Sequence, residues 1–267
     1  MACFSPTGTS RKVAQAIVKG IGAGEAIELD VTKTPLTTIT TLTRDEVLVV
    51  AVPVYGNACA PIALQRLDNL RGTDTPAVCV VVYGNRDFGY AARELSDFLT
   101  QRGFRVVGAA AFVGEHSYST PDLPIAEGRP HADDLQEAKN FGLMLRSKVP
   151  YDVPAIDAEK LKCPSDSLLG RLRFKAFVWR YQRAQKKHPV KVLPITDKAR
   201  CTACGLCAKV CPVAAIPTER PTETAGSCIK CAACVKACPQ RARTLPTPFA
   251  PVLAKNFKKQ KPNIIIY

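Results

Sequence analysis

The N-terminal half of the chain alternates between short, continuously apolar runs and segments whose apolar residues have helical spacing. The apolar runs at residues 46–52, 77–83 and 104–113 predict buried strands. Residues 61–70 and 91–103 instead repeat apolar side chains every three to four positions, which indicates helices. Buried strands that alternate with helices are typical of a parallel sheet covered on both faces. The pattern therefore predicts an α/β domain with a doubly wound sheet.

Further elements are predicted at the two ends of this half. Residues 1–4 form a short apolar strand, and helical spacing follows over residues 13–22. Residues 25–31 predict a second short strand, and residues 131–148 predict a closing helix. The threonine-rich segment at residues 32–44 lacks a clear helical pattern. The predicted sheet accordingly has five strands.

Three loops follow the carboxyl ends of predicted strands, at residues 5–10, 53–60 and 84–90. Ligands of open parallel sheets bind outside these ends. The first loop is rich in hydroxyls and leads into a helix, so free backbone N–H groups and the helix dipole predict a phosphate site. A simple helix cap is the alternative. The other two loops contain glycine, asparagine and aromatic residues, as a planar ring system held between them requires.

The middle of the chain is rich in proline at residues 149–166 and then predicts a helix at 167–187. Two apolar faces run along this helix between seven Lys and Arg residues; one face has Leu168, Leu172, Ala176 and Trp179, and the other has Phe174, Phe177, Val178 and Tyr181. A helix lying on a membrane surface is one interpretation. We favour an inter-domain helix that packs one face on each module, because two apolar faces suit two protein neighbours better than one bilayer.

Eight of the twelve cysteines form two ladders of identical spacing, 27 residues apart. Each ladder has the pattern Cys-x2-Cys-x2-Cys-x3-Cys-Pro, and the eight residues are Cys201, Cys204, Cys207, Cys211, Cys228, Cys231, Cys234 and Cys238. Structural zinc sites use paired Cys-x2-4-Cys motifs, which the third cysteine and the Cys-Pro end fit poorly. Disulfides are disfavoured because nothing in the sequence marks the chain for export. The spacing therefore predicts iron–sulfur clusters.

Both ladders resemble the cysteine motif of bacterial ferredoxins that hold two [4Fe–4S] clusters. In that motif the first three cysteines hold one cluster and the fourth binds the other. The resemblance implies one metal site of Cys201, Cys204, Cys207 and Cys238, and a second of Cys228, Cys231, Cys234 and Cys211. A strand near residues 191–193 is expected to begin the ferredoxin domain and to pair with residues 243–245.

The first loop also resembles a known motif, the phosphate loop of flavodoxins. The other two loops match the positions of the loops that hold the flavin ring in that family. The resemblance implies FMN as a cofactor, bound by Ser5, Pro6, Thr7, Gly8, Thr9, Ser10, Pro53, Val54, Tyr55, Gly56, Asn57, Tyr83, Gly84, Asn85, Arg86, Asp87, Phe88 and Gly89. Arg86 is a candidate for stabilising negative charge on the reduced flavin. The first strand is central in the sheet of that family, so its length of about four residues indicates either a start codon further upstream or a weakened core.

Taken together, the chain resembles the flavodoxin-like/ferredoxin fusion proteins of anaerobic bacteria. The expected fold class is α/β: a flavodoxin-like, doubly wound, five-stranded parallel sheet, with a second, small α+β ferredoxin-like two-cluster domain. We expect an FMN domain at residues 1–149, a proline-rich linker with a basic amphipathic helix at 150–189, the cluster domain at 190–246 and a basic tail at 247–267. The tail either packs back on the protein or remains mobile.

Charge is distributed unevenly along the chain. The formal net charge is +14, of which residues 1–150 contribute −1 and residues 151–267 contribute +15. Each cluster with its four thiolates offsets about −2 of this excess. The basic half predicts an acidic redox partner, with an anionic membrane surface or nucleic acid as alternatives. No nucleic-acid reading module is recognisable, and no apolar run of transmembrane length or signal peptide is present, which predicts a cytoplasmic protein.

The leading functional interpretation is an electron-transfer protein that passes electrons between FMN and an external redox partner through two clusters. One alternative is a flavin-dependent reductase of a small substrate, although no G-x-G-x-x-G nucleotide motif follows a predicted strand. Another is a cluster-based redox sensor that binds nucleic acid. Outside these sites, His116 is expected to make local hydrogen bonds, and Cys3 and Cys79 are expected to be buried. Cys59 lies in a predicted flavin loop, where it has no further support as a reactive thiol.

Overall fold

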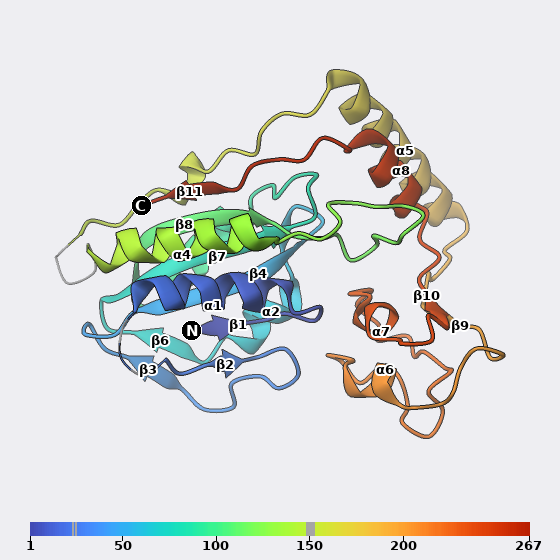
Figure 1. The fold of residues 1–267 in the computed structure, drawn as a ribbon, viewed down its shortest axis with the longest axis horizontal. Coiled ribbons are helices and arrows are strands. Elements are labelled where there is room, and N and C mark those ends of the chain that lie inside the picture. The colour runs from blue at the N-terminus through green and yellow to red at the C-terminus, as the bar shows by residue number, and fades with distance from the viewer. Residues whose placement is uncertain (23, 25, 148–152) are drawn as a thin grey trace. The chain divides into compact units, whose positions relative to one another are not determined.

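The computed structural model describes the chain except for residues 23, 25 and 148–152 (Figure 1). It forms two compact units, each described here by itself. The first unit comprises Met1–Glu115, Gly128–Pro164 and Lys261–Tyr267, and the second comprises His116–Glu127 and Ser165–Gln260. The expected domain boundary between residues 149 and 150 lies outside the described residues, as does the first residue of the strand expected at 25–31.

The first unit is built on a mostly parallel sheet. Its parallel strands are β1 (Ala2–Cys3), β2 (Leu29–Asp30), β4 (Leu48–Tyr55), β7 (Thr75–Tyr83) and β8 (Phe104–Val113). They lie in the order β2-β1-β4-β7-β8. Numbered along the chain, this is the 2-1-3-4-5 order of flavodoxin-like folds. The predicted α/β architecture with a parallel sheet is therefore confirmed.

The first strand is short but lies between two neighbours, β2 and β4. Backbone hydrogen bonds extend beyond the two residues of β1: Leu29 donates to the Met1 carbonyl over 2.8 Å, and Phe4 donates to the Ala51 carbonyl over 3.2 Å. Ala2, Cys3 and Phe4 are all fully buried. The sheet is thus continuous across its shortest strand, and β1 ends where the first predicted binding loop begins.

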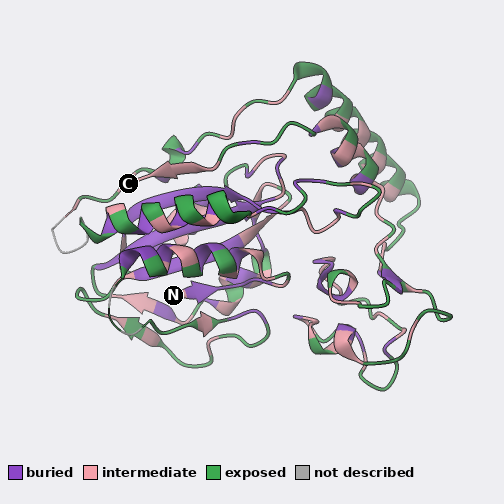
Figure 2. Ribbon diagram, viewed as in Figure 1, coloured by how far each residue is buried: buried purple, intermediate pink, exposed green. Residues whose placement is uncertain are grey.

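Two helices cover one face of this sheet, α1 (Thr9–Ile21) and α4 (Ala132–Arg146), which lie side by side in Figure 1. Their apolar faces pack on inward-facing side chains of the strands, Val49, Ala51, Val78, Val80, Ala110 and Phe112 among them. Close approach of the two helices requires glycine at Gly20 and Gly142, since a Cβ at either position would lie within about 2.1 Å of a carbonyl oxygen of the facing helix. Figure 2 shows the sheet buried and the outer sides of both helices exposed.

The remaining helices of this unit are α2 (Pro61–Arg66) and α3 (Ala91–Thr100), and a short 3₁₀ turn, η1, spans Ala158–Lys160. The helix predicted at 61–70 ends at Arg66. After it, β6 (Leu70–Gly72) pairs in parallel with β3 (Thr40–Leu42), which lies in the threonine-rich segment. This strand pair was not predicted, because three-residue strands carry no readable alternation of polar and apolar positions.

The C-terminal tail returns to the first unit. Its strand β11 (Ile264–Ile266) pairs antiparallel with β8 and forms an edge of the sheet. Of the two expectations for the tail, packing back on the protein is the one that the structure shows.

A buried polar cluster fastens this tail. Arg129 and Asp134 form an ion pair in which both side chains are at most 6% exposed. The Arg129 guanidinium also donates to the Lys261 carbonyl over 3.3 Å and to Asn263 Oδ1 over 3.2 Å. Asn263 in turn donates to Asp134 over 2.8 Å and accepts from the Val113 N–H over 2.9 Å. The ion pair therefore holds the tail next to the end of β8.

The second unit contains a helix pair, α5 (Leu168–Lys187) and α8 (Phe249–Asn256). One aromatic face of α5 packs on α8 and the segment after it, through ring contacts of Phe174, Phe177 and Tyr181 with Phe249 and Phe257. The other face does not pack as expected for an inter-domain helix: Leu168, Leu172 and Trp179 are 69%, 53% and 59% exposed.

The cysteine ladders occupy the rest of the second unit. Each ladder contains one short helix, α6 (Leu206–Lys209) in the first and α7 (Ala233–Lys236) in the second. A two-stranded antiparallel sheet of β9 (Ile195–Thr196) and β10 (Arg243–Thr244) closes the region. The pairing partner of the expected strand near 191–193 is thus correct, but that strand begins at Ile195.

The loop 116–127, which follows β8 along the chain, also belongs to the second unit. Ser119 accepts a 2.9 Å hydrogen bond from the Lys236 ammonium of α7. The pKa of Tyr118 is raised by burial and, to a smaller extent, by the charges of Cys228 and Cys231. This loop therefore packs beside the second cysteine ladder.

We expect Arg129→Met to destabilise the first unit strongly, because it leaves the Asp134 carboxylate buried without its cation. Breaking a buried pair in this way costs about 3–5 kcal/mol. Urea unfolding followed by circular dichroism measures the loss. Arg93→Met is the matched control, since Arg93 forms exposed ion pairs with Asp97 and Glu159, and such pairs contribute about 0–1 kcal/mol. Equal losses in the two variants would contradict the assignment.

The same pair predicts a pH dependence. Burial raises the pKa of Asp134, but hydrogen bonds from Arg129 and Asn263 outweigh burial and hold this pKa below its usual value. A carboxyl with a depressed pKa in the folded state stabilises the fold above its unfolded pKa, and this contribution is lost as the pH falls through the folded pKa. Acid titrations of stability should therefore show a loss that is absent from Arg129→Met.

Candidate functional site

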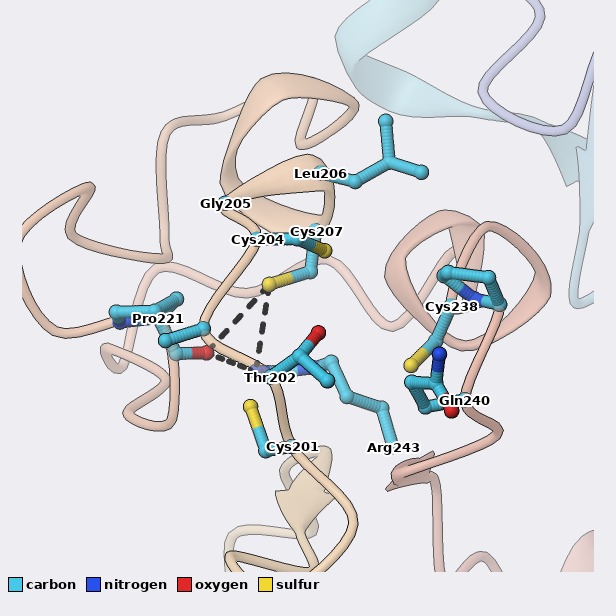
Figure 3. A pocket seen from close by; sticks show the side chains of 12 residues that line it. Cys201, Thr202, Cys204, Gly205, Leu206, Cys207, Pro221, Cys238, Gln240 and Arg243 are labelled. Atoms are coloured by element: carbon cyan, nitrogen blue, oxygen red, sulfur yellow. Dashed lines mark hydrogen bonds between the residues drawn. The ribbon is translucent and has the colours of Figure 1, made fainter.

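The two cysteine ladders line two separate pockets in the second unit. The first pocket is lined by Cys201, Cys204 and Cys207 of the first ladder together with Cys238 of the second ladder. Figure 3 shows Cys238 reaching this pocket from a different segment than the other three thiols. The structure thus places the fourth cysteine of the second ladder beside the first three of the first ladder.

The second pocket has the reciprocal composition. Cys228, Cys231 and Cys234 line it together with Cys211, the last cysteine of the first ladder. No three His, Cys, Asp or Glu side chains in the described part of the chain converge closely enough to hold a single metal ion. The thiols instead surround two spaces, and four thiolates around one space form the donor set of a [4Fe–4S] cluster.

Several backbone N–H groups donate to the cysteine sulfurs. Ala215 donates to Cys211 over 3.2 Å, and Ala242 donates to Cys238 over 3.3 Å. These two contacts are equivalent in the repeat, since Ala242 follows Ala215 by the ladder spacing of 27 residues. Hydrogen bonds to cluster sulfurs stabilise negative charge and tune reduction potentials. The sequence does not reveal these donors, because they come from the backbone.

The two pockets differ in exposure. Cys204 of the first pocket is exposed, whereas Cys231 and Cys234 of the second pocket are buried. Burial raises the pKa of the Cys231 thiol to about 12. The first pocket is therefore the more accessible of the two within the second unit.

Arg243 is a charged residue of this region that sequence reasoning did not single out. It lines the first pocket and is only 3% exposed. Its guanidinium contacts Cys207 Sγ at 3.9 Å and donates to the Pro221 carbonyl over 2.6 Å, as the dashed lines in Figure 3 mark. A comparison of the two repeats was the signal available in the sequence, since position 216 in the first repeat is isoleucine.

In the first unit, the loop Ser5–Ser10 connects β1 to α1 and is shaped by its own hydrogen bonds. Ser5 Oγ accepts from the Arg11 N–H over 3.1 Å, and Gly8 precedes the helix with φ +81°, a left-handed conformation that favours glycine. The hydroxyls of Thr7 and Thr9 lie 3.3 Å apart. The first turn of α1 contains no acidic residue. Hydroxyls and the open N–H groups of a helix start are thus available to an anion.

The other two predicted flavin loops contact each other at Asn57. Arg86 donates to Asn57 Oδ1, and the Tyr90 N–H donates to the Asn57 carbonyl over 2.9 Å. Gly56 and Asn57 form a turn with positive φ, after which β5 (Ala58–Cys59) folds back on β4. A Cβ at Gly89 would lie 2.4 Å from Asn57, so glycine is required for this contact. The structure therefore brings these two loops together at the carboxyl edge of the sheet.

Not every predicted ring-loop residue is accessible. Tyr83 and Phe88 are buried and pack edge to face with ring centroids 5.3 Å apart. The Asn85 side chain is also buried and accepts from the Lys261 N–H over 3.0 Å. Tyr90, just beyond the predicted set, is 60% exposed and is the accessible aromatic residue at this loop. The contribution of Lys261 could not be foreseen, because it follows from the return of the tail.

The cysteines and histidine outside these sites have local roles. Cys3 and Cys79 are buried as predicted. Cys59 is also buried; its thiol donates to the Ala91 carbonyl over 3.2 Å, and burial raises its pKa, so it is not a reactive thiol. His116 Nδ1 accepts from the Tyr118 N–H over 3.0 Å, which confirms the expected local hydrogen bond.

Comparison with known families identifies the cysteine-rich region. Residues 194–216 and residues 225–242 each match the profile of the 4Fe-4S binding domain. These are two 4Fe-4S binding domains. Each match contains one ladder, so the chain joins a unit with flavodoxin-like strand order to a pair of ferredoxin-type segments, as the sequence predicted. Iron–sulfur binding points to a role in electron transfer.

Among solved structures, one match is a flavodoxin from the domain Archaea. It shares 15% sequence identity with this chain and has a TM-score of 0.39, and the match covers 56% of this chain and 96% of that one. No protein with a curated description matches the chain. Within the described residues, no helix combines the length and the apolar character needed to cross a membrane.

Proposed function

We propose that this protein is an iron–sulfur flavoprotein that passes electrons between FMN and an external redox partner through two [4Fe–4S] clusters. The observation that carries the proposal is the exchange of cysteines between the two pockets, in which Cys238 joins the first ladder and Cys211 joins the second. This is the ligand pattern of a two-cluster ferredoxin. Cys201, Cys204, Cys207 and Cys238 would hold one cluster, and Cys228, Cys231, Cys234 and Cys211 the other.

The flavin part of the proposal is supported by the three loops at one edge of the sheet. Thr7, Thr9 and the start of α1 would hold the FMN phosphate, and the loops that meet at Asn57 would position the ring. The exposed Tyr90 and the half-buried Tyr55 are the aromatic residues available to the ring. A bound flavin exchanges one or two electrons, whereas each cluster exchanges one, so the pair links two-electron donors to one-electron carriers.

The external partner is proposed to be acidic. Lys198 and Arg200 are exposed close to the exposed Cys204 in the chain, and Arg200 donates to the carbonyl of Gln240, which lines the first pocket. A rim of positive charge beside the more accessible pocket would attract an acidic protein and hold it close to the cluster. The first pocket is therefore the proposed docking end.

Protein purified under anaerobic conditions should contain about eight iron atoms and eight acid-labile sulfides per chain, as two four-iron clusters require. Iron, zinc and sulfide analysis with an absorption spectrum makes the measurement. Cys238→Ser should damage the cluster of the first pocket and Cys211→Ser that of the second. Cys163→Ser, outside both ladders, should leave the iron content unchanged. Stoichiometric zinc without sulfide would contradict the cluster assignment.

FMN should bind in preference to FAD, and Thr9→Val should weaken its binding. Removal of one charge-assisted hydrogen bond to the phosphate costs about 1.5–3 kcal/mol, or about 10- to 150-fold in Kd. Quenching of flavin fluorescence on titration with apoprotein measures the affinity. Thr37→Val changes an exposed threonine away from the loop and should have no effect. If the unmodified protein fails to quench FMN fluorescence, the flavin part of the proposal is wrong.

Electron transfer to an acidic ferredoxin, used as the probe, should be fast at low salt and should slow steeply with ionic strength. The Debye length falls from about 30 Å at 0.01 M to about 8 Å at 0.15 M. Stopped-flow spectroscopy gives the rate. Charge reversal at Lys198 and Arg200 should slow association more than reversal at Lys186 and Lys187, which lie at the end of α5.

Rates that do not change between these two salt concentrations would contradict the docking proposal. Trp179 is the only tryptophan of the chain, so its fluorescence reports on the exposed face of α5. Binding to anionic vesicles that shifts this fluorescence and is lost in Trp179→Ala would instead support the membrane-surface interpretation of α5. Sequence-selective DNA binding would support the sensor.

A further inference from the structure

The repeat of the cysteine ladders assigns an equivalent to each residue of this region. The position 27 residues after Ile216 is Arg243, so an apolar residue of the first repeat corresponds to an arginine in the second. The two residues occupy corresponding places, because Ile216 lines the second pocket and Arg243 lines the first. Ile216 packs in a cluster with Cys207 and Cys234, one thiol from each pocket. The repeat therefore departs from apolar character at the one position that separates the pockets.

Arg243 contacts the thiols of both ladders as well. Its guanidinium lies 3.9 Å from Cys207 Sγ in the first pocket. Burial raises the pKa of Cys234, in the second pocket, while the charge of Arg243 and a hydrogen bond from it lower that pKa. One buried cation thus reaches a predicted ligand of each cluster.

The side chain of Arg243 is held in place by neutral groups. Its guanidinium donates to Thr196 Oγ1 over 3.0 Å, to the Pro221 carbonyl and to Thr224 Oγ1. Within the described residues, its buried Nε has no hydrogen-bond partner. These contacts orient the guanidinium without neutralising it, and arginine remains protonated at any ordinary pH. The charge is therefore available to the pockets on either side.

We infer that Arg243 is a shared cation that raises the reduction potentials of both clusters. The inference rests on the proposed function, in that it requires both clusters to be bound. Each cluster takes up one electron and becomes more negative by one charge. A buried cation at contact distance favours the more negative state, because a protein interior screens charge far less than water does. Lowered repulsion between the two sites would follow from the same charge.

Arg243→Ile tests the inference, because it gives the second repeat the residue that the first repeat already has. Potentiometric titration with dithionite as the electron donor, followed by electron paramagnetic resonance, measures both potentials in the purified holoprotein. Both should shift downward relative to the unmodified protein. Arg243→Lys, which keeps the charge, should retain most of the original potentials. Arg241→Gln is the matched control, because it removes the same charge from an exposed neighbour and should leave both potentials unchanged.

Iron and sulfide analysis of the same samples separates this inference from the proposed function. Unmodified protein without clusters would refute the proposed function itself. If Arg243→Ile keeps about eight iron atoms and both potentials are unchanged, the inference is wrong. A shift of only one potential would overturn the shared role. If Arg243→Ile does not assemble clusters, Arg243→Gln replaces it, and equal potentials in the glutamine and lysine variants would also overturn the inference.

Discussion

The second unit depends on the exchange of cysteines between its two ladders. Neither pocket is complete without a thiol from the other repeat, so the two repeats cannot fold around their cofactors independently. A protein of this kind gains much of its folding free energy from cofactor binding. The small helices α6 and α7, of four residues each, are too short to be stable on their own and are consistent with this dependence.

Sequence reasoning was most effective where one residue type at one spacing has few structural uses. The cysteine ladders and the long apolar strands are of this kind, and their family match and strand order agree with the predictions. It was least effective where a contact depends on distant segments. The pair of β3 and β6, the return of β11 to β8, and the link from Lys261 to Asn85 join residues whose local patterns carry no sign of their partners.

The candidate site was predictable to a similar degree. Spacing alone indicated which cysteines would meet, but it could not indicate that Tyr83 and Phe88 pack inward, because aromatic residues in a Gly-rich loop read alike whether they face a ligand or a core. The role of Arg243 was also hidden in a linear reading, since an arginine between two proline-containing turns resembles many exposed ones. Its significance emerges from burial and from the repeat together.

The path of the chain has a consequence for taking the protein apart. The backbone leaves the first unit after Glu115 and again after Pro164, and it re-enters this unit at Gly128 and at Lys261. The second unit is therefore an insertion rather than an appended domain. A single proteolytic cut in the segment between Pro164 and α5 would not release it, because β11 and the loop 116–127 remain as tethers that keep both parts at a high effective concentration. Evolution or engineering that exchanges the cluster module must preserve several junctions at once.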